Sequence, residues 1–105
     1  MRLPCSVALA AILNFCVSAA SAAEKPARLG LCASCHGEDG RALAPGTPNL
    51  AGQNLDYLRS AVSQYQSGAR DMPVMRAALA MLGAADLDRV LVWYAQVPML
   101  PARAP

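Results

Sequence analysis

Several residue types that mark particular functions are scarce in this sequence of 105 residues. Histidine occurs once, aromatic residues make up 5% of the chain and charged residues 15%. The nine Lys and Arg residues barely outnumber the seven Asp and Glu residues, so the chain lacks the basic excess that neutralises phosphates, and nucleic acid is not expected as a partner. Hydrophobic residues reach 55%, which excludes a disordered chain. The length suffices for one compact domain.

The first 23 residues have the order of a secretory signal peptide. Arg2 is the single charge before Glu24, Leu3 to Val17 is mostly apolar, and residues 18–23 are all small. The apolar stretch is shorter than the ~20 residues of a membrane-spanning helix. We therefore expect cleavage after Ala22 or Ala23, a periplasmic location and no stable membrane insertion after removal of the signal peptide.

Removal of the signal peptide leaves residues 24–97 as one predicted domain and residues 98–105, rich in Pro and Ala, as a predicted flexible tail. The net charge falls from +2 to +1 with the loss of one arginine, and two of the four cysteines leave as well. A domain of about 80 residues has a small core and often recruits a disulfide, a metal or a large cofactor. The remaining cysteines, Cys32 and Cys35, are candidates for such a role.

The domain is predicted to be all-α, because apolar residues recur at helical spacing and no alternating β-branched run is present. Helices are expected at residues 26–35, at 55–67 and from 83 or 84 to about 97, with two short helical turns at 76–82. Residues 37–52 contain four Gly and two Pro, so this segment is expected to be irregular. Residues 69–74 are expected to form a loop because they include Pro73.

The most informative motif is the sequence from Cys32 to His36, CASCH, which has the C-x-x-C-H arrangement of covalent haem attachment. Two thiols three residues apart on one turn can add to the two vinyl groups of a haem, and the next residue then directs its imidazole at the iron. A buried haem would also supply apolar surface to a small core. The predicted cofactor is one haem c, covalently bound through Cys32 and Cys35, with His36 as an iron ligand.

Three other uses of the two cysteines fit the sequence less well. A thioredoxin-like C-x-x-C motif would need a βαβ context, which is absent from the pattern. Zinc needs about four ligands, and Cys32, Cys35 and His36 supply three. A disulfide within this short loop would remove little entropy from the unfolded chain.

The second axial ligand of the iron is expected to be a methionine, because the chain has one histidine and the thioether sulfur is a soft ligand. The mature chain offers Met72, Met75, Met81 and Met99. Met99 lies in the tail, and Met81 falls in a helical segment where a core role is expected. Met72 and Met75 flank Pro73, and the residues alone do not choose between them.

The chain from residue 32 to 94 resembles the short bacterial class I cytochromes c, whose single-haem domains also occur in pairs in two-haem periplasmic cytochromes. The resemblance is carried by CASCHGEDG at 32–40, PNLAGQ at 48–53, Tyr57 and Leu58, and by residues 82–87 together with Trp93 and Tyr94. It implies a small cytochrome c fold of three to five helices wrapped around one covalently attached haem.

The resemblance also implies roles for two further residues. Pro48 stands where the family places a proline whose carbonyl accepts a hydrogen bond from the proximal imidazole, here that of His36. The family's methionine ligand lies seven residues before a leucine that precedes the last helix. Counting back from Leu82 reaches Met75, with Met72 as the alternative.

The sequence departs from the family pattern at three positions. Glu24 and Arg28 stand where many members have a Gly and an aromatic that pack on the last helix, so the contact of the first helix with Trp93 or Tyr94 is left open. Gly83 replaces the usual Ser at the N-cap of the last helix, a difference of a few tenths of a kcal/mol.

A haem with both axial positions filled has no site for a substrate, so we do not expect an enzyme. The resemblance implies a carrier of single electrons whose redox protein partners dock transiently at the haem edge. One alternative is a haem-bearing subunit of a larger oxidoreductase. Another, if Met75 does not bind, is a five-coordinate haem sensor or peroxidase. Arg70 is a candidate partner for a haem propionate, although a solvated arginine is the simpler interpretation.

Overall fold

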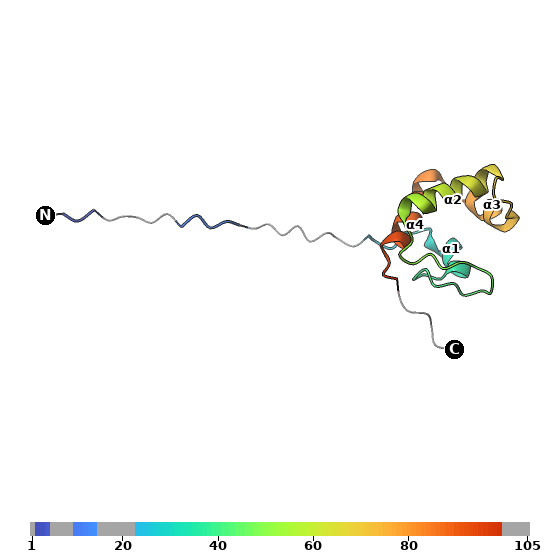
Figure 1. Ribbon diagram of the computed structural model, residues 1–105, viewed down its shortest axis with the longest axis horizontal. Coiled ribbons are helices and arrows are strands. Elements are labelled where there is room, and N and C mark those ends of the chain that lie inside the picture. The colour runs from blue at the N-terminus through green and yellow to red at the C-terminus, as the bar shows by residue number, and fades with distance from the viewer. Residues whose placement is uncertain (1, 5–9, 15–22, 100–105) are drawn as a thin grey trace.

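The computed structural model describes residues 2–4, 10–14 and 23–99, and this part of the chain contains four α-helices and no strand (Figure 1). The helices are α1 (Leu29–His36), α2 (Leu55–Ser67), α3 (Pro73–Ala80) and α4 (Ala84–Gln96). The predicted all-α fold class is confirmed. None of the described helices is both long enough and apolar enough to span a bilayer.

The sequence predicts a signal peptide at the N-terminal end of the chain and a flexible tail at the C-terminal end. Most of the expected signal peptide, and the part of the expected tail from residue 100 onward, lie outside the described residues. The described pieces before residue 23, residues 2–4 and 10–14, have no regular secondary structure. The proposed cleavage site and the domain limits therefore stay predictions.

Helix α1 begins later than the sequence predicts and ends one residue later. The chain turns at Pro26, whose carbonyl accepts a hydrogen bond from the Leu29 amide at 3.2 Å, so the first helical residue is Leu29. The helix ends after His36 because Gly37 adopts a φ of 78°, which favours glycine. The C-x-x-C-H motif thus occupies the C-terminal end of α1.

Helix α2 has the limits that the sequence predicts. Its first turn is capped by Asn54, whose side-chain oxygen accepts a hydrogen bond from the Tyr57 amide at 3.0 Å. It ends at Gly68, which has the left-handed conformation common after helices. These two caps and the apolar spacing explain why this helix could be predicted fully.

The sequence predicts a loop through residue 74, but the structure has helix α3 from Pro73 onward, so this prediction is wrong. Pro73 is the first residue of the helix, where its missing N–H group is not needed and its fixed φ suits the first turn. The helix therefore starts three residues before the predicted Arg76 and ends at Ala80, before the predicted Leu82. Met75 lies in the first turn of α3 and not in a loop.

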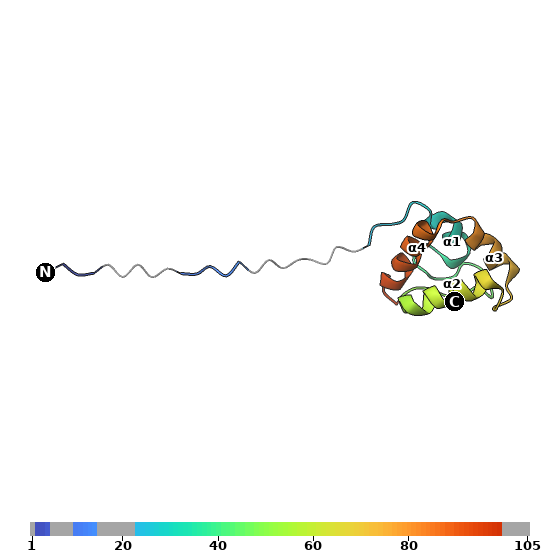
Figure 2. The same cartoon turned by 90° about the horizontal axis from the view of Figure 1, so that it is seen from above.

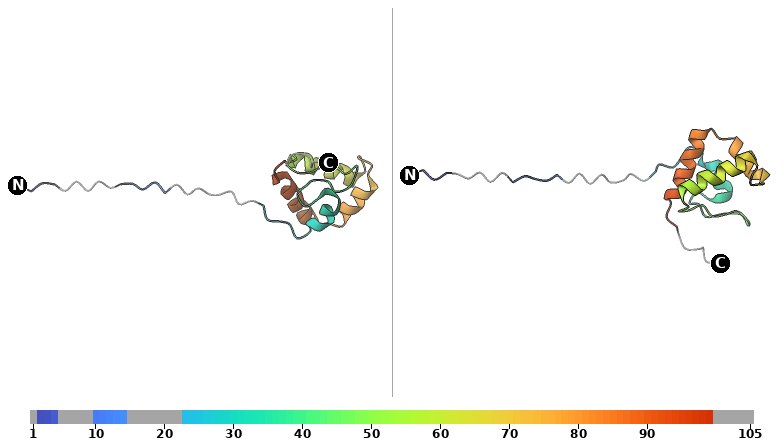
Figure 3. Two further views of the ribbon diagram at one scale, coloured as in Figure 1. Left: turned by 90° about the horizontal axis from the view of Figure 1, so that it is seen from below. Right: turned by 45° about the horizontal axis from the view of Figure 1, so that its top comes forward.

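The helices surround a small apolar core. Helix α2 packs against both α3 and α4, and α1 lies across from α2, between α3 and α4 (Figures 2 and 3). The buried core residues are Leu29, Leu58, Leu79, Leu87, Val90, Leu91 and Tyr94. Every helix contributes at least one of them, so the core fixes where the motif at the end of α1 lies relative to α3.

Candidate functional site

The two cysteines of the motif lie one helical turn apart on α1. Both are free thiols, and Cys35 is exposed whereas Cys32 is partly buried. Burial raises the pKa of the Cys32 thiol. Reactive cysteines of redox-active C-x-x-C motifs have a lowered pKa, so Cys32 does not have the character of a thioredoxin-like nucleophile.

The imidazole of His36 is buried, with 6% of the residue exposed, and has a defined orientation. Its Nδ1 atom lies 2.9 Å from the carbonyl oxygen of Pro48. Because a carbonyl oxygen only accepts hydrogen bonds, Nδ1 must carry the proton. In the neutral imidazole with its proton on Nδ1, the lone pair lies on Nε2, which is the form of histidine that binds a metal.

Two aromatic side chains of α4 hold the backbone that follows His36. The buried hydroxyl of Tyr94 donates a hydrogen bond to the carbonyl of Gly37 at 2.8 Å, and Trp93 Nε1 donates one to the carbonyl of Glu38 at 2.7 Å. Burial raises the pKa of Tyr94, with smaller contributions from nearby Cys and acidic groups. The phenol therefore stays protonated and keeps donating at neutral pH. Both residues of α4 thus contact the segment that directly follows α1.

The described methionines differ in their surroundings. Met75 is partly buried and packs against the same core cluster as Cys32 does. Met72, the N-cap of α3, is 46% exposed. Met81 is 63% exposed and follows the end of α3, so the predicted core role for Met81 is wrong. Met99 is 77% exposed.

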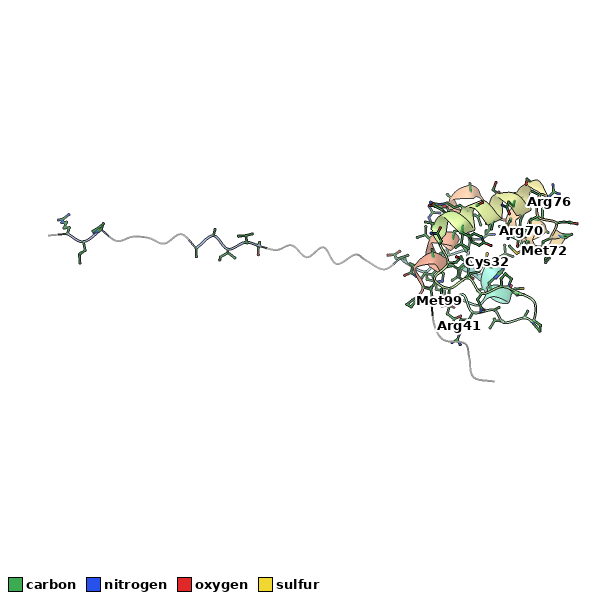
Figure 4. The ribbon with its side chains drawn as sticks, viewed as in Figure 1. Cys32, Arg41, Arg70, Met72, Arg76 and Met99 are labelled. Atoms are coloured by element: carbon green, nitrogen blue, oxygen red, sulfur yellow. The ribbon has the colours of Figure 1, made fainter. Side chains whose placement is uncertain are left out.

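The guanidinium group of Arg70 is not simply solvated. It lies over the ring of Tyr65, with 5.1 Å between its central carbon and the ring centroid, and Nη1 donates to the Tyr65 hydroxyl at 3.4 Å. These contacts with Tyr65, and a second hydrogen bond with Tyr57, raise the pKa of Arg70. In Figure 4, Arg70 lies beside Met72 at the connection between α2 and α3.

The donors at the end of α1 fit a c-type haem better than a metal ion. Among the described residues, no three His, Cys, Asp or Glu side chains are grouped closely enough to hold an ion, although the motif itself contains two Cys and one His. The three side chains therefore do not converge on one point, as zinc would require. Thiols one turn apart beside an imidazole with a free lone pair suit a larger group that is attached at two carbons and bound through its iron. The chain thus has the attachment site of one haem c.

An all-α domain that carries a C-x-x-C-H haem site defines the class of c-type cytochromes. No family model matches the chain. It is 46% identical over 52 residues to cytochrome c-554(548) of Halomonas halodenitrificans, covering 50% of this chain and 63% of the relative. It is 34% identical over 82 residues to cytochrome c4 of Pseudomonas aeruginosa, covering 78% and 41%.

A third relative, named thiosulfate dehydrogenase electron acceptor, comes from Stutzerimonas stutzeri and is 37% identical over 68 residues, covering 64% of this chain and 32% of the relative. The matched part of the chain therefore spans less than two thirds of the length of each of these relatives. Together with the fold and the motif, these similarities place the chain in the class I c-type cytochromes.

Some residues of the site were not found from the sequence. Asn49, next to Pro48, accepts a hydrogen bond from the Ala42 amide at 2.8 Å. Tyr94 is one of the residues that carry the family resemblance, but the sequence assigns no partner to its hydroxyl, which donates to the Gly37 carbonyl. The signal for Tyr94 was available, since a tyrosine in a core position needs a partner for its hydroxyl. Asn49 lies in the PNLAGQ segment that carries the family resemblance, but that segment assigns no role to its side chain.

Proposed function

We propose that the exported protein is a periplasmic carrier of single electrons. The observation that carries this proposal is the orientation of His36, whose Nδ1 is bonded to the Pro48 carbonyl at 2.9 Å and whose Nε2 keeps its lone pair. A histidine oriented in this way is suited to permanent ligation of iron. The working form is proposed to be the chain without its signal peptide, with residues 24–97 as the cytochrome domain and residues 98–105 as its tail.

Each residue of the site has a proposed task. Cys32 and Cys35 would hold the haem through thioether bonds, and His36 and Met75 would be the axial ligands of its iron. The bound haem would supply reversible exchange of one electron between its ferrous and ferric states. The hydrogen bond to Pro48 would keep the imidazole in one orientation and increase its basicity.

Met75 is proposed as the ligand opposite His36, with Met72 as the alternative. Met75 lies in the first turn of α3 and packs against the same core as Cys32, whereas Met72 is almost half exposed. A thioether ligand favours the ferrous state and a comparatively high potential. With both axial positions filled, the protein would have no site for a substrate and would not be an enzyme.

The partners are proposed to be redox proteins that dock transiently at the haem edge. The Stutzerimonas relative is named as the electron acceptor of a thiosulfate dehydrogenase, which supports a dehydrogenase as the class of electron donor. The mature chain has a net charge of about +1 before the haem propionates are added, so long-range electrostatic steering would be weak. A free carrier should elute alone as a monomer, whereas a subunit of a larger oxidoreductase should co-purify with its partners.

The ligand assignment is tested by substituting each methionine separately. We expect the ferric protein to show a charge-transfer band from a methionine sulfur to iron. Met75→Ala should abolish this band, and Met72→Ala, the matched control at the residue directly before α3, should retain it. The absorption spectra of purified, oxidised proteins provide the measurement. Retention of the band in both variants would show that another residue is the ligand, and its absence from the unsubstituted protein would favour a five-coordinate sensor or peroxidase.

A further inference from the structure

The hydrogen bond between His36 and Pro48 depends on a loop that packing alone does not hold. Pro48 and Asn49 are both exposed, so neither side chain is buried in the core. Glycines and prolines are frequent from Gly37 to Gly52, and the structure has no helix in this segment. The position of the Pro48 carbonyl must therefore be set largely by hydrogen bonds within the loop.

The first half of this loop, which follows α1, is hydrogen-bonded to the haem motif. The amide of Leu43 donates a hydrogen bond to the carbonyl of Cys35 at 2.9 Å. The neighbouring amide, that of Ala42, donates to Asn49 Oδ1 at 2.8 Å. The side chain of Asn49 thus links the second half of the loop to Ala42 and Leu43, and Leu43 is hydrogen-bonded directly to the motif.

These bonds close a circuit around the imidazole. Asn49 is covalently joined to Pro48, whose carbonyl receives the His36 Nδ1 proton, and His36 directly follows the Cys35 whose carbonyl starts the circuit. Apart from the imidazole, every atom in this circuit belongs to the backbone except those of the Asn49 side chain. Asn49 is therefore the one point at which a side-chain substitution can open the circuit without removing His36.

A second clamp on the same loop does not involve a side chain. The carbonyl of Gly40 accepts hydrogen bonds from the amides of Leu50 and Ala51 at 2.7 and 3.1 Å. Gly40 has a φ of 76°, and a Cβ atom there would lie 2.5 Å from the Ala51 amide nitrogen. This backbone clamp should keep the loop folded when Asn49 is replaced, so that the effect on the Pro48 carbonyl can be measured.

We infer that Asn49 is a positioning residue for the proximal iron ligand. Its side-chain oxygen holds the Pro48 carbonyl in line with His36 Nδ1 and thereby sets the strength of that hydrogen bond. A stronger bond makes the imidazole a better electron donor to iron and favours the ferric state. The inference rests on the proposed function, in which His36 binds the haem iron.

The test compares Asn49→Ala with Asn54→Ala in the haem-loaded protein. Asn54 is a matched control, because its Oδ1 also accepts a hydrogen bond from a backbone amide, at 3.0 Å, and it is also exposed. In Asn49→Ala the His36 Nδ1 proton should exchange with solvent faster by up to about tenfold, the effect expected for loss of one net hydrogen bond. NMR measures this exchange.

The second readout is the ratio of ferrous to ferric protein at a fixed ambient potential. Asn49→Ala should raise this ratio roughly three- to tenfold, less than the 10- to 100-fold effects typical of removing a direct partner of a metal ligand. Asn49→Asp keeps an acceptor oxygen and adds negative charge, so the exchange should stay slow and the ratio should not rise. The serine side chain of Asn49→Ser is too short to reach the Ala42 amide, so this variant should behave like Asn49→Ala.

The two proposals fail in different ways. If Asn49→Ala and Asn54→Ala change the proton exchange and the ferrous-to-ferric ratio equally while the haem and the methionine band are intact, the inference about Asn49 is wrong and the proposed function stands. If His36 does not bind iron in the unsubstituted protein, both are wrong.

Discussion

The two sides of the site are built with different rigidity. On the histidine side, His36 is 6% exposed and three side-chain hydrogen bonds, from His36, Trp93 and Tyr94, hold the backbone around it. On the methionine side, Met75 is only partly buried, and α3 has one buried residue, Leu79. The positions of the two proposed iron ligands are therefore set by different kinds of contact.

This difference predicts an order of opening. Elements with few buried contacts and exposed backbone open at lower free energy than the core. Helix α3 should therefore separate from the core before the end of α1 loosens. If Met75 is the ligand, its bond to iron should be lost while His36 stays in place.

The largest expected effect comes from removing the one buried side chain of α3. Leu79 is 4% exposed, and Leu79→Ala should lower the free energy of unfolding by about 2–5 kcal/mol. Because the cavity lies under α3, the methionine charge-transfer band should disappear at a lower denaturant concentration than the helical circular dichroism. Parallel urea titrations followed by the two signals measure the separation.

Leu87 on α4 provides the control for this experiment. It is 6% exposed, so Leu87→Ala should destabilise the protein by a similar amount. Because Leu87 belongs to α4 and not to α3, the two signals should move together. If Leu79→Ala also shifts both signals together, the domain unfolds as one unit and the two sides do not differ in local stability.

A smaller effect is expected from the hydroxyl of Tyr94 on the histidine side. Tyr94 is fully buried and donates to the Gly37 carbonyl at 2.8 Å. Tyr94→Phe leaves this carbonyl without its partner and should cost about 1–3 kcal/mol of unfolding free energy. The band should then be lost together with the rest of the structure. Tyr65→Phe on α2, where the hydroxyl is only partly buried, is the comparison variant and should cost less.

The same substitution should change the response to alkaline pH. The pKa of Tyr94 is raised by burial in the folded protein, whereas the unfolded chain has a tyrosine pKa of about 10. Above that pH the unfolded chain releases a proton that folded Tyr94 retains, so stability falls as pH rises, by up to about 1.4 kcal/mol per pH unit. Stability measured from pH 8 to 11 should fall less steeply in Tyr94→Phe. An unchanged slope would mean that Tyr94 ionises normally in the folded protein.

The same two sides differ in how far they could be predicted. On the histidine side, a five-residue motif fixes the chemistry of Cys32, Cys35 and His36, because spacing along one turn determines which atoms can reach one haem. The acceptor carbonyl of Pro48 followed only from the family resemblance. The role of Asn49 depends on how a loop folds back on itself, and such long-range pairing leaves no periodic signal.

On the methionine side, the limits of α3 were harder to predict, because its residues fit more than one local pattern. Pro73 predicts a loop when it is read as a helix breaker, but proline is also favoured as the first helical residue. Helix α3 therefore starts three residues earlier than the sequence predicts. Met81 was expected in the core because it lies in an apolar stretch, but the helix ends before it and it is exposed. Helix α2 was predicted correctly because Asn54 and Gly68 both give unambiguous end signals.

The smallest expected effect tests whether stabilising one end of α4 reaches the methionine side. Gly83 is the N-cap of α4, with backbone angles of −67° and 155° that suit a capping serine, and nothing lies within 4 Å of an added Cβ. Gly83→Ser should add a few tenths of a kcal/mol to the free energy of unfolding, because its hydroxyl can accept from an amide of the first turn. Urea denaturation should show a higher global midpoint and an unchanged midpoint for the methionine band. If both midpoints rise equally, α3 and α4 open together, and the contrast between the two sides lies in their bonding to iron and not in their stability.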